Sequence, residues 1–305
     1  MSQQSHPVQR IRAIALTVSD VDRSQAFYIN ALGFELVSDL TENRNLEGAK
    51  NAKIRSVTLR LGDEQIKLMQ YLNIKGKPIP KDSQSNDLWF QHLAIVVSDL
   101  DRAYAHLKSF AIEPISTAPQ TIPPDNLASA GVRAFKFKDP DLHDLELVWF
   151  PPDKGQAKWY QNSDRLFLGI DHTAITISKT EQSLYFYRDL LGMHVDGGSL
   201  NQGETQARLD GLPEAKVRIT ALRPAKGGLG IELLDYLTPE NGRSIPEDWK
   251  SWDIASVQVE FFVHRIEVIV DRLQQNHVHS VSSSSHHCLV RDPDGHRILL
   301  TADQF

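Results

Sequence analysis

The side chains able to hold a metal in this sequence are imidazoles and carboxylates. The chain contains 12 His and 39 Asp plus Glu residues but a single cysteine, Cys288. One cysteine cannot form an internal disulfide or a Cys-rich zinc site. Any metal bound by this chain is therefore expected to sit among histidine nitrogens and carboxylate oxygens.

Composition and charge narrow the class of protein. A length of 305 residues favours two domains. The chain has 41% hydrophobic and 24% charged residues, an ordinary globular composition that excludes a collagen-like or wholly disordered protein. The formal net charge of −6 offers no basic field for nucleic acid. The N-terminus has no apolar segment of the kind that directs export, and no run of about 18 apolar residues predicts membrane insertion. A cytoplasmic location is therefore expected.

The elements that must position these side chains form an internal repeat. Two clear copies, Ile11–Phe34 and Ile170–Met193, each read as a strand followed by a helix that ends at Leu-Gly. Weaker copies run over Gln91–Leu107 and Val257–Leu273. The sequence therefore contains four units, which begin near residues 11, 91, 170 and 257.

Hairpin strands follow each helix, as in Ser56–Leu61 and Gln65–Met69. The second and fourth units close with similar tight turns, Asp139-Pro-Asp-Leu-His143 and Asp292-Pro-Asp-Gly-His296, before a last strand. Each unit is thus predicted to be β-α-β-β-β. The Pro-rich and polar stretch Phe150–Ala157 is the expected linker between the two halves of the chain.

These paired units and turns resemble the vicinal oxygen chelate superfamily, which includes glyoxalase I, bleomycin-resistance proteins, epimerases and extradiol dioxygenases. The resemblance implies an α+β fold of four βαβββ modules, in which curled mixed sheets carry their helices outside. It also implies two glyoxalase-like domains, 9–150 and 168–303. It is specific for the fold and weak for the reaction.

In this superfamily the first strand of a unit supplies a His or Gln ligand and the last strand a Glu. The second unit has His92 and Glu146 at these positions, and the third has His172 and Glu232. The first has Ala13 and Lys67 and the fourth has Gln258 and Leu299, so neither of these units has both ligands. Pairing consecutive units would leave both sites incomplete. Pairing the second unit with the third, and the first with the fourth, gives one complete site and one vacant one, and we favour this exchanged pairing.

The resemblance implies one divalent metal (Ni, Zn, Co, Mn or Fe) held by His92, Glu146, His172 and Glu232. The expected activity is that of a metal-dependent lyase or isomerase of the glyoxalase I or epimerase type. Such an enzyme chelates a small-molecule substrate through two adjacent oxygens and stabilises an enolate-like intermediate, with Glu146 or Glu232 as base. Two alternatives remain, a non-haem Fe(II) extradiol-type dioxygenase and a non-catalytic binding protein of the same fold. The expected assembly is a monomer or a homodimer.

Other residues receive more ordinary interpretations. We expect Lys67 to pair with a carboxylate, and His143 and His296 to stabilise their turns. Tyr236, Val148 and Phe150 are candidates for pocket walls because they alternate onto the same faces as the Glu positions. We expect two hairpins to determine substrate specificity, Thr41–Ala52 and Ser199–Ala207. The His-rich tract with His277, His279, His286 and His287 is expected to be an exposed loop.

Overall fold

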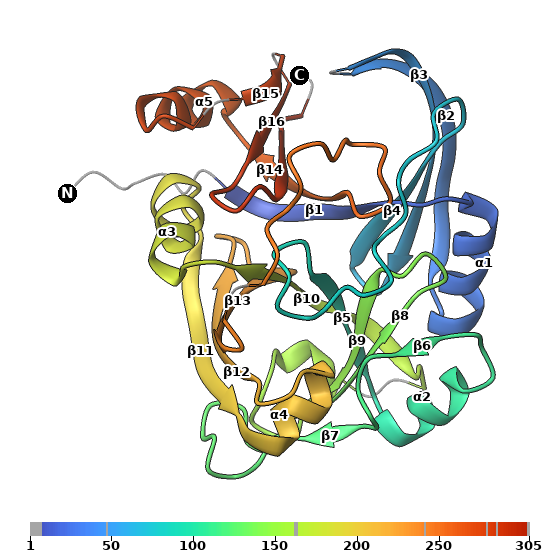
Figure 1. Cartoon of the computed structure of the whole chain (residues 1–305), viewed down its shortest axis with the longest axis vertical. Helices are drawn as coiled ribbons and strands as arrows, with labels where there is room; N and C mark the ends of the chain where they lie inside the picture. The colour runs from blue at the N-terminus through green and yellow to red at the C-terminus, as the bar shows by residue number, and fades with distance from the viewer. Residues whose placement is uncertain are drawn as a thin grey trace.

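Two curled mixed sheets with helices on their outer faces form the protein, as seen in a computed structural model (Figure 1). The structure describes residues 8–46, 48–161, 164–240, 242–278, 280–284 and 286–303. His279 of the His-rich tract lies outside the described residues. The α+β architecture matches the expected one.

The first sheet has eight strands and combines the first and fourth units. Its strands lie in the order β15 (Ser280–Ser283), β16 (His287–Arg291), β17 (Arg297–Thr301), β14 (Val257–Val263), β1 (Val8–Thr17), β4 (Glu64–Tyr71), β3 (Ala49–Leu61) and β2 (Glu35–Leu46). The predicted Thr41–Ala52 hairpin is the tip of β2 and β3. Strands β15 and β16 correct the expectation of a loop over the His-rich tract.

The second sheet has nine strands and combines the second and third units. Their order is β11 (His194–Gln202), β12 (Lys216–Arg223), β13 (Gly230–Thr238), β10 (Phe167–Ile177), β5 (Gln91–Val97), β9 (Asp144–Trp149), β8 (Arg133–Lys138) and β6 (Glu113–Pro114), with β7 (Gln120–Thr121) beside β8.

The exchanged pairing of the units is confirmed by the strand register. Strand β1 pairs antiparallel with β14, and β10 pairs antiparallel with β5. All residues of β5 and nearly all of β10 are buried, as expected for strands at the centre of a sheet whose two faces are covered. Each sheet therefore takes strands from both halves of the chain, and the division into domains 9–150 and 168–303 stays a prediction.

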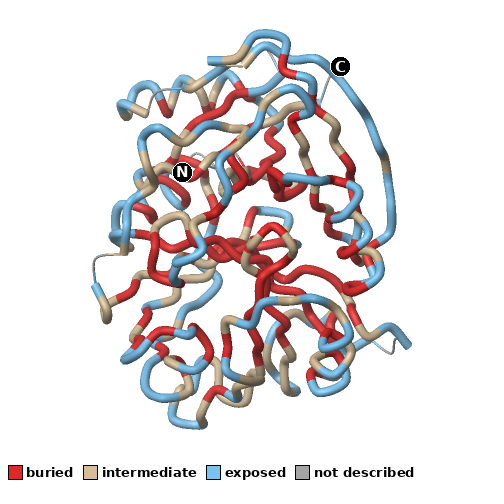
Figure 2. Tube along the Cα trace, turned by 45° about the vertical axis from the view of Figure 1, so that its right-hand side comes forward, coloured by how far each residue is buried: buried red, intermediate tan, exposed pale blue. Residues whose placement is uncertain are grey.

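Four helices pack against the main hydrophobic core: α1 (Val21–Leu32), α2 (Leu100–Leu107), α3 (Thr180–Leu184) and α5 (Ile266–Gln275). Helix α4 (Gly203–Asp210) packs on the opposite face of the second sheet, where Leu209 contacts Ala134. Figure 2 shows buried residues in red. A π-helical turn, Tyr185–Leu190, continues α3, and a 3-10 turn, Ala157–Tyr160, lies just after the predicted linker. Helix α4 replaces the end of the hairpin predicted over Ser199–Ala207.

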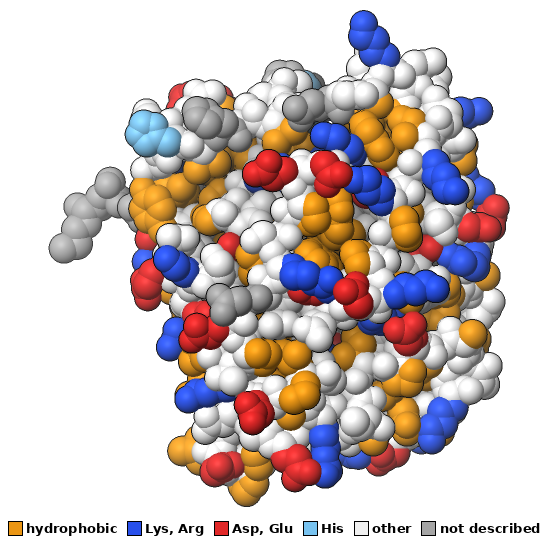
Figure 3. Space-filling view, viewed as in Figure 1, with side chains coloured by type: hydrophobic (Ala, Val, Ile, Leu, Met, Phe, Trp, Pro, Cys, Tyr) orange, Lys and Arg blue, Asp and Glu red, His pale blue; other side chains and the backbone are white. Residues whose placement is uncertain are grey.

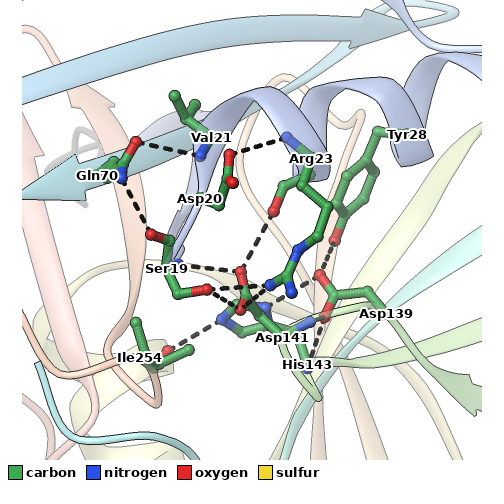
Figure 4. A network of polar contacts seen from close by, with 11 residues as sticks. Ser19, Asp20, Val21, Arg23, Tyr28, Gln70, Asp139, Asp141, His143 and Ile254 are labelled. Carbon is green, nitrogen blue, oxygen red and sulfur yellow. Dashed lines mark hydrogen bonds and ion pairs between the residues drawn. The ribbon is translucent and has the colours of Figure 1, made fainter.

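The Asp-Pro-Asp-X-His turns tie neighbouring units together (Figure 4). Within the first turn, His143 Nδ1 lies 3.0 Å from Asp139 Oδ2, which also accepts a hydrogen bond from the Tyr28 hydroxyl of α1. The carboxylate of Asp141 bonds to Ser19 and pairs with Arg23 at the start of the same helix. The first unit is thereby fixed to the second, across the two sheets.

The second turn repeats this arrangement in the other half of the chain. His296 Nδ1 lies 2.8 Å from Asp292 Oδ2, and the Tyr187 hydroxyl donates to the same carboxylate. Both histidines are buried within these networks. The structural role predicted for His143 and His296 is confirmed.

The molecular surface mixes charges of both signs. Lys and Arg side chains alternate with Asp and Glu over the face in Figure 3, without a field of one sign. Among the described residues, no helix is long and apolar enough to cross a membrane.

Candidate metal centre

Four strands at the centre of the second sheet carry the predicted ligands. His92 is on β5, Glu146 on β9, His172 on β10 and Glu232 on β13. Cross-strand pairing places Ala94 opposite both His172 and Glu146, and Ala174 opposite both His92 and Glu232. Directly paired residues share a face of a sheet, so all four side chains point to the same face. The two small alanines leave room between them.

Three of the four predicted ligands converge, and Glu232 lies beside this group without joining it. One ligand atom each of His92, Glu146 and His172 lies within 4.8 Å of the others. His92 Nε2 is 3.3 Å and His172 Nε2 is 3.8 Å from Glu146 Oε2, and Glu232 Oε2 lies 3.3 Å from His172 Nε2. Glu232 thus approaches the group from the His172 side. Its side chain is 25% exposed, whereas those of the other three are at most 9% exposed.

Three of the four ring nitrogens of His92 and His172 are buried without a hydrogen bond. Within the described residues, His172 Nε2 and both ring nitrogens of His92 are buried and make no hydrogen bond. Buried polar atoms are rarely left unpaired, because the loss of hydration costs about 1–3 kcal/mol. Two imidazoles and a carboxylate that converge on one point fit a divalent transition metal.

The electrostatics of the centre divide the two carboxylates. Burial alone would raise the pKa of Glu146, but His92, Lys136 and His172 outweigh it and lower the pKa to about 2. Burial raises the pKa of Glu232, although His172 opposes this effect. Burial lowers the pKa of His92 to about 4, so that this imidazole is neutral and able to bind a metal. Glu146 is therefore the carboxylate more firmly held in its ionised form.

Asp171 orients His172, a role that the sequence analysis missed. Its Oδ2 lies 3.0 Å from His172 Nδ1, which directs Nε2 toward the centre. Arg223 donates to the same oxygen at 2.8 Å, and Trp159 Nε1 donates to Oδ1 at 3.0 Å. The position next to a candidate ligand histidine was the available signal.

A buried cation beside the centre was also missed. Lys136 on β8 pairs with Glu146 across the strands and bonds through Nζ to Asp210 Oδ1 at 2.7 Å. Asp210 ends helix α4 and also accepts hydrogen bonds from Tyr236 and Gln206. This network fastens α4 over the second sheet.

Apolar groups enclose the centre on two sides. Val148 and Phe150 pack with Trp159, which comes from the segment after the predicted linker. Phe90 and Tyr236 pack around Ala174 on the other side, and the Phe90 ring lies 5.7 Å from that of His92. The predicted apolar wall is therefore present, and Tyr236 adds a hydroxyl that is already bonded to Asp210.

The remaining four predicted positions lie together in the first sheet. Ala15 pairs with both Lys67 and Gln258, just as Ala174 pairs with Glu232 and His92. Lys67 Nζ is 2.5 Å from Glu260 Oε2, which confirms its predicted carboxylate partner. Ala13 and Leu299 complete this set, which offers a metal no imidazole.

Both halves of the chain match one family model. It describes the Glyoxalase/Bleomycin resistance protein/Dioxygenase superfamily and covers residues 10–147 and 169–300. The chain belongs to this superfamily.

Relatives of this chain have different descriptions. A 2-epi-5-epi-valiolone epimerase from Actinomyces sp is 29% identical over 150 residues, 46% of this chain and 79% of the relative. The uncharacterised protein YwkD of Bacillus subtilis is 28% identical over 142 residues, 46% of this chain and 96% of the relative. Glyoxalase I from Zea mays shares the fold over 97% of this chain and 93% of its own, with a TM-score of 0.64 and 14% identity.

Proposed function

We propose that this protein is a metal-dependent enzyme of the glyoxalase I or epimerase type. It holds one divalent metal on His92, Glu146, His172 and Glu232, and it moves a proton at a carbon next to a carbonyl group. The small-molecule substrate carries two adjacent oxygens. The observation that carries this proposal is the convergence of His92, His172 and Glu146 in the second sheet, with three imidazole nitrogens buried without a hydrogen bond and Glu232 3.3 Å from His172 Nε2.

The metal, when bound, would act as a Lewis acid that stabilises negative charge on the substrate oxygens. Glu146 is the fixed carboxylate of the centre, because it is buried between both histidines and faces Lys136. Glu232 is the base, because it is the ligand candidate whose side chain reaches solvent. Its Oε2 accepts the proton from the substrate carbon and, in an isomerisation, returns it to a neighbouring carbon; in an epimerisation a second acid delivers a proton to the opposite face of the carbon.

The surroundings of the site support this division of roles. Trp159, Val148 and Phe90 enclose the centre and keep water from a carbanion-like species. Asp171 holds the His172 ring so that only Nε2 faces the centre. The Actinomyces relative is named an epimerase, which is consistent with proton transfer at carbon.

Metal analysis with exchange of substrate hydrogen tests the proposal. Purified protein is expected to contain one divalent metal per chain, and His172→Ala and Glu146→Gln to lose it. A panel of linear and cyclic α-hydroxyketones, including 2-epi-5-epi-valiolone, is incubated in deuterium oxide and followed by NMR. Glu232→Gln is expected to abolish deuterium uptake at the carbon next to the carbonyl, whereas the exposed-residue control His264→Gln exchanges at the wild-type rate.

Absence of stoichiometric metal after loading would contradict the metal centre. Metal binding without deuterium uptake over the whole panel would leave the centre intact but would refute proton transfer for these substrates. Exchange retained in Glu232→Gln and lost in Glu146→Gln would reverse the two carboxylates.

A ring-cleaving dioxygenase is the second candidate. Two histidines and one carboxylate are the ligands that non-haem Fe(II) oxygenases use, and His92, Glu146 and His172 form such a group. The proximity of Glu232 to His172 favours the first proposal, since a fourth ligand occupies a position that oxygen or catechol would need. Oxygen uptake by anaerobically Fe(II)-loaded protein over a panel of catechols would favour the dioxygenase.

A further inference from the structure

The first sheet encloses a cavity on the face equivalent to the metal centre. It has a volume of about 940 Å³, near the upper end of the range of ordinary ligand pockets. Strands β1, β3, β4 and β14 to β17 line it, together with the end of β2 and with Ser251 and Ser256 from the segment before β14. In the second sheet, Trp159 and helix α4 pack over the corresponding face. The two sheets thus differ in their free space as well as in their ligands.

The strand register shows what replaced the metal ligands. Lys67 occupies the position that corresponds to Glu232, and Gln258 that of His92. Glu260 stands where the second sheet has Ala94, since it pairs with both Ala13 and Leu299. Its carboxylate accepts the bond from Lys67. A fixed ammonium group therefore lies where the other sheet would hold a metal cation.

Lys67 keeps access to the cavity despite this bond. Its side chain is 33% exposed, whereas that of Glu260 is 5% exposed. An ammonium group has three donor hydrogens, and one bond to Glu260 leaves others for a ligand. The amide side chain of Gln258 also lines the cavity.

The charge of the lining contrasts with that of the chain. Five Lys and Arg residues face three Asp and Glu residues around the cavity, whereas the chain as a whole carries a formal charge of −6. The set consists of Arg10, Arg12, Arg44, Lys67 and Arg297 against Glu42, Asp63 and Glu260. A concave surface lined by one excess sign concentrates ligands of the opposite sign.

Arg44, Arg297 and Tyr71 also line the cavity, and Arg44 pairs there with Glu42. Burial raises the pKa of the Tyr71 hydroxyl, and a hydrogen bond with Ser251 and the charges of Arg297 and Arg44 oppose that rise. Met69, Leu289 and Leu299 provide apolar surface elsewhere in the lining. This combination suits a ligand with an organic body and anionic groups.

We propose that the cavity of the first sheet is a binding site for a small organic anion, a carboxylate or phosphate ester of metabolite size. Lys67 binds an anionic oxygen of the ligand, Arg44 and Arg297 bind at the Tyr71 end, and the Gln258 amide donates a further hydrogen bond. Glu260 restrains Lys67 and limits affinity. The site is separate from the metal centre and does not depend on a bound metal.

Isothermal titration calorimetry on the full chain, at constant ionic strength, tests this site with three probes. These are phthalate, phenyl phosphate and, as a cation of similar size, benzyltrimethylammonium. Saturable binding of phthalate, phenyl phosphate or both supports the site and identifies the preferred anion class, and benzyltrimethylammonium is expected not to bind. Treatment with a chelator is expected to leave the affinity unchanged.

Charge variants give opposite expected shifts. The double variant Lys67→Met with Glu260→Gln removes the ion pair as a unit and is expected to weaken anion binding about tenfold or more, the loss of one charge-assisted contact. Glu260→Gln alone releases Lys67 and removes a negative charge, so anion affinity is expected to increase. Arg44→Gln is expected to weaken anion binding. Arg60→Gln is the control and is expected to leave binding unchanged, because Arg60 is exposed and pairs with Glu35 outside the cavity.

Several results would overturn the proposal. One is no saturable binding of either anion at millimolar concentration by folded protein. A second is binding of benzyltrimethylammonium as tight as that of the anions, and a third is loss of anion binding after treatment with a chelator. A fourth is the same anion affinity in the wild type, in Glu260→Gln and in the double variant Lys67→Met with Glu260→Gln. Circular dichroism and metal content confirm that each variant is folded, because the metal centre lies in the other sheet.

Discussion

At the scale of single residues, the candidate centre depends on imidazole nitrogens that are buried without a hydrogen bond and are therefore available to bind a metal. His172 is the clearest case, because Asp171 occupies Nδ1 and leaves Nε2 buried and without a partner. A carboxylate in this position fixes the tautomer and the orientation of a ligand ring. The contribution of Asp171 can therefore be measured separately from that of the ligands.

Asp171→Asn is expected to weaken metal binding about 10- to 100-fold, since the amide cannot hold the His172 ring as the carboxylate does. Competition with a coloured chelator measures the affinity on protein shown to be folded. Asp196→Asn is the matched control, because Asp196 pairs with the same Arg223 but does not touch His172. Equal affinities for the wild type and Asp171→Asn would mean that Asp171 does not orient the ligand.

At the scale of elements, helix α4 is held by the glycines at its ends. Gly203 and Gly211 both have positive φ, at 81° and 59°. A Cβ at Gly203 would meet nothing within 4 Å, whereas one at Gly211 would lie 2.7 Å from the Ile115 carbonyl oxygen. The same backbone strain is thus combined with a close contact at Gly211 alone.

Gly203→Ala is expected to cost about 1 kcal/mol of unfolding free energy, and Gly211→Ala clearly more, because the backbone of Ile115 must move. Urea denaturation compares the two variants. Because α4 carries Asp210, the partner of Lys136, Gly211→Ala is also expected to lower activity once a substrate is found. Equal losses of stability in the two variants would contradict the importance of the Ile115 contact.

The Asp-Pro-Asp-X-His turn is the second element with a measurable signature. Burial alone would lower the pKa of His143, but Asp139 outweighs it and raises the pKa to about 9. An unfolded histidine titrates near 6.5. The folded protein therefore holds this proton more tightly, and the stabilisation is complete below about pH 6.5 and is lost as the pH rises through 9.

A shift of this size corresponds to about 3 kcal/mol of unfolding free energy across the interval. Thermal or urea denaturation is expected to show that stability decreases as the pH rises from 6 to 9.5. This decrease is expected to be less steep in His143→Gln than in the wild type. His264→Gln, an exposed histidine outside the turns, should retain the wild-type slope. A slope unchanged in His143→Gln would assign the pH dependence to other groups, of which His296 in the second turn is the first to test.

At the scale of the whole molecule, the repeat made much of the arrangement predictable. The exchanged pairing followed from counting ligands, because only the second and third units could supply a complete set, and the sheets have this pairing. Glu260, Lys136 and α4 were not predicted. Each acts through a neighbour from a distant part of the chain, and strand periodicity contains no information on such contacts.

The exchanged pairing makes the two halves of the chain depend on each other. Either half alone leaves the central strands of both sheets without partners, because β1 needs β14 and β10 needs β5. A protease site inserted between Asp153 and Lys154, in an exposed part of the linker, allows the halves to be separated after folding. We expect the cleaved halves to remain a 1:1 complex with the wild-type metal content, as measured by light scattering and metal analysis.

The halves produced separately are expected not to fold as monomers, since each would expose strand edges and apolar faces that the other half covers. Mixing them during refolding should restore the 1:1 complex and its metal, because His92 and Glu146 come from one half and His172 and Glu232 from the other. A half that folds alone as a monomer and binds metal would show that consecutive units can pair. That result would contradict the exchanged sheets and, with them, the shared metal centre.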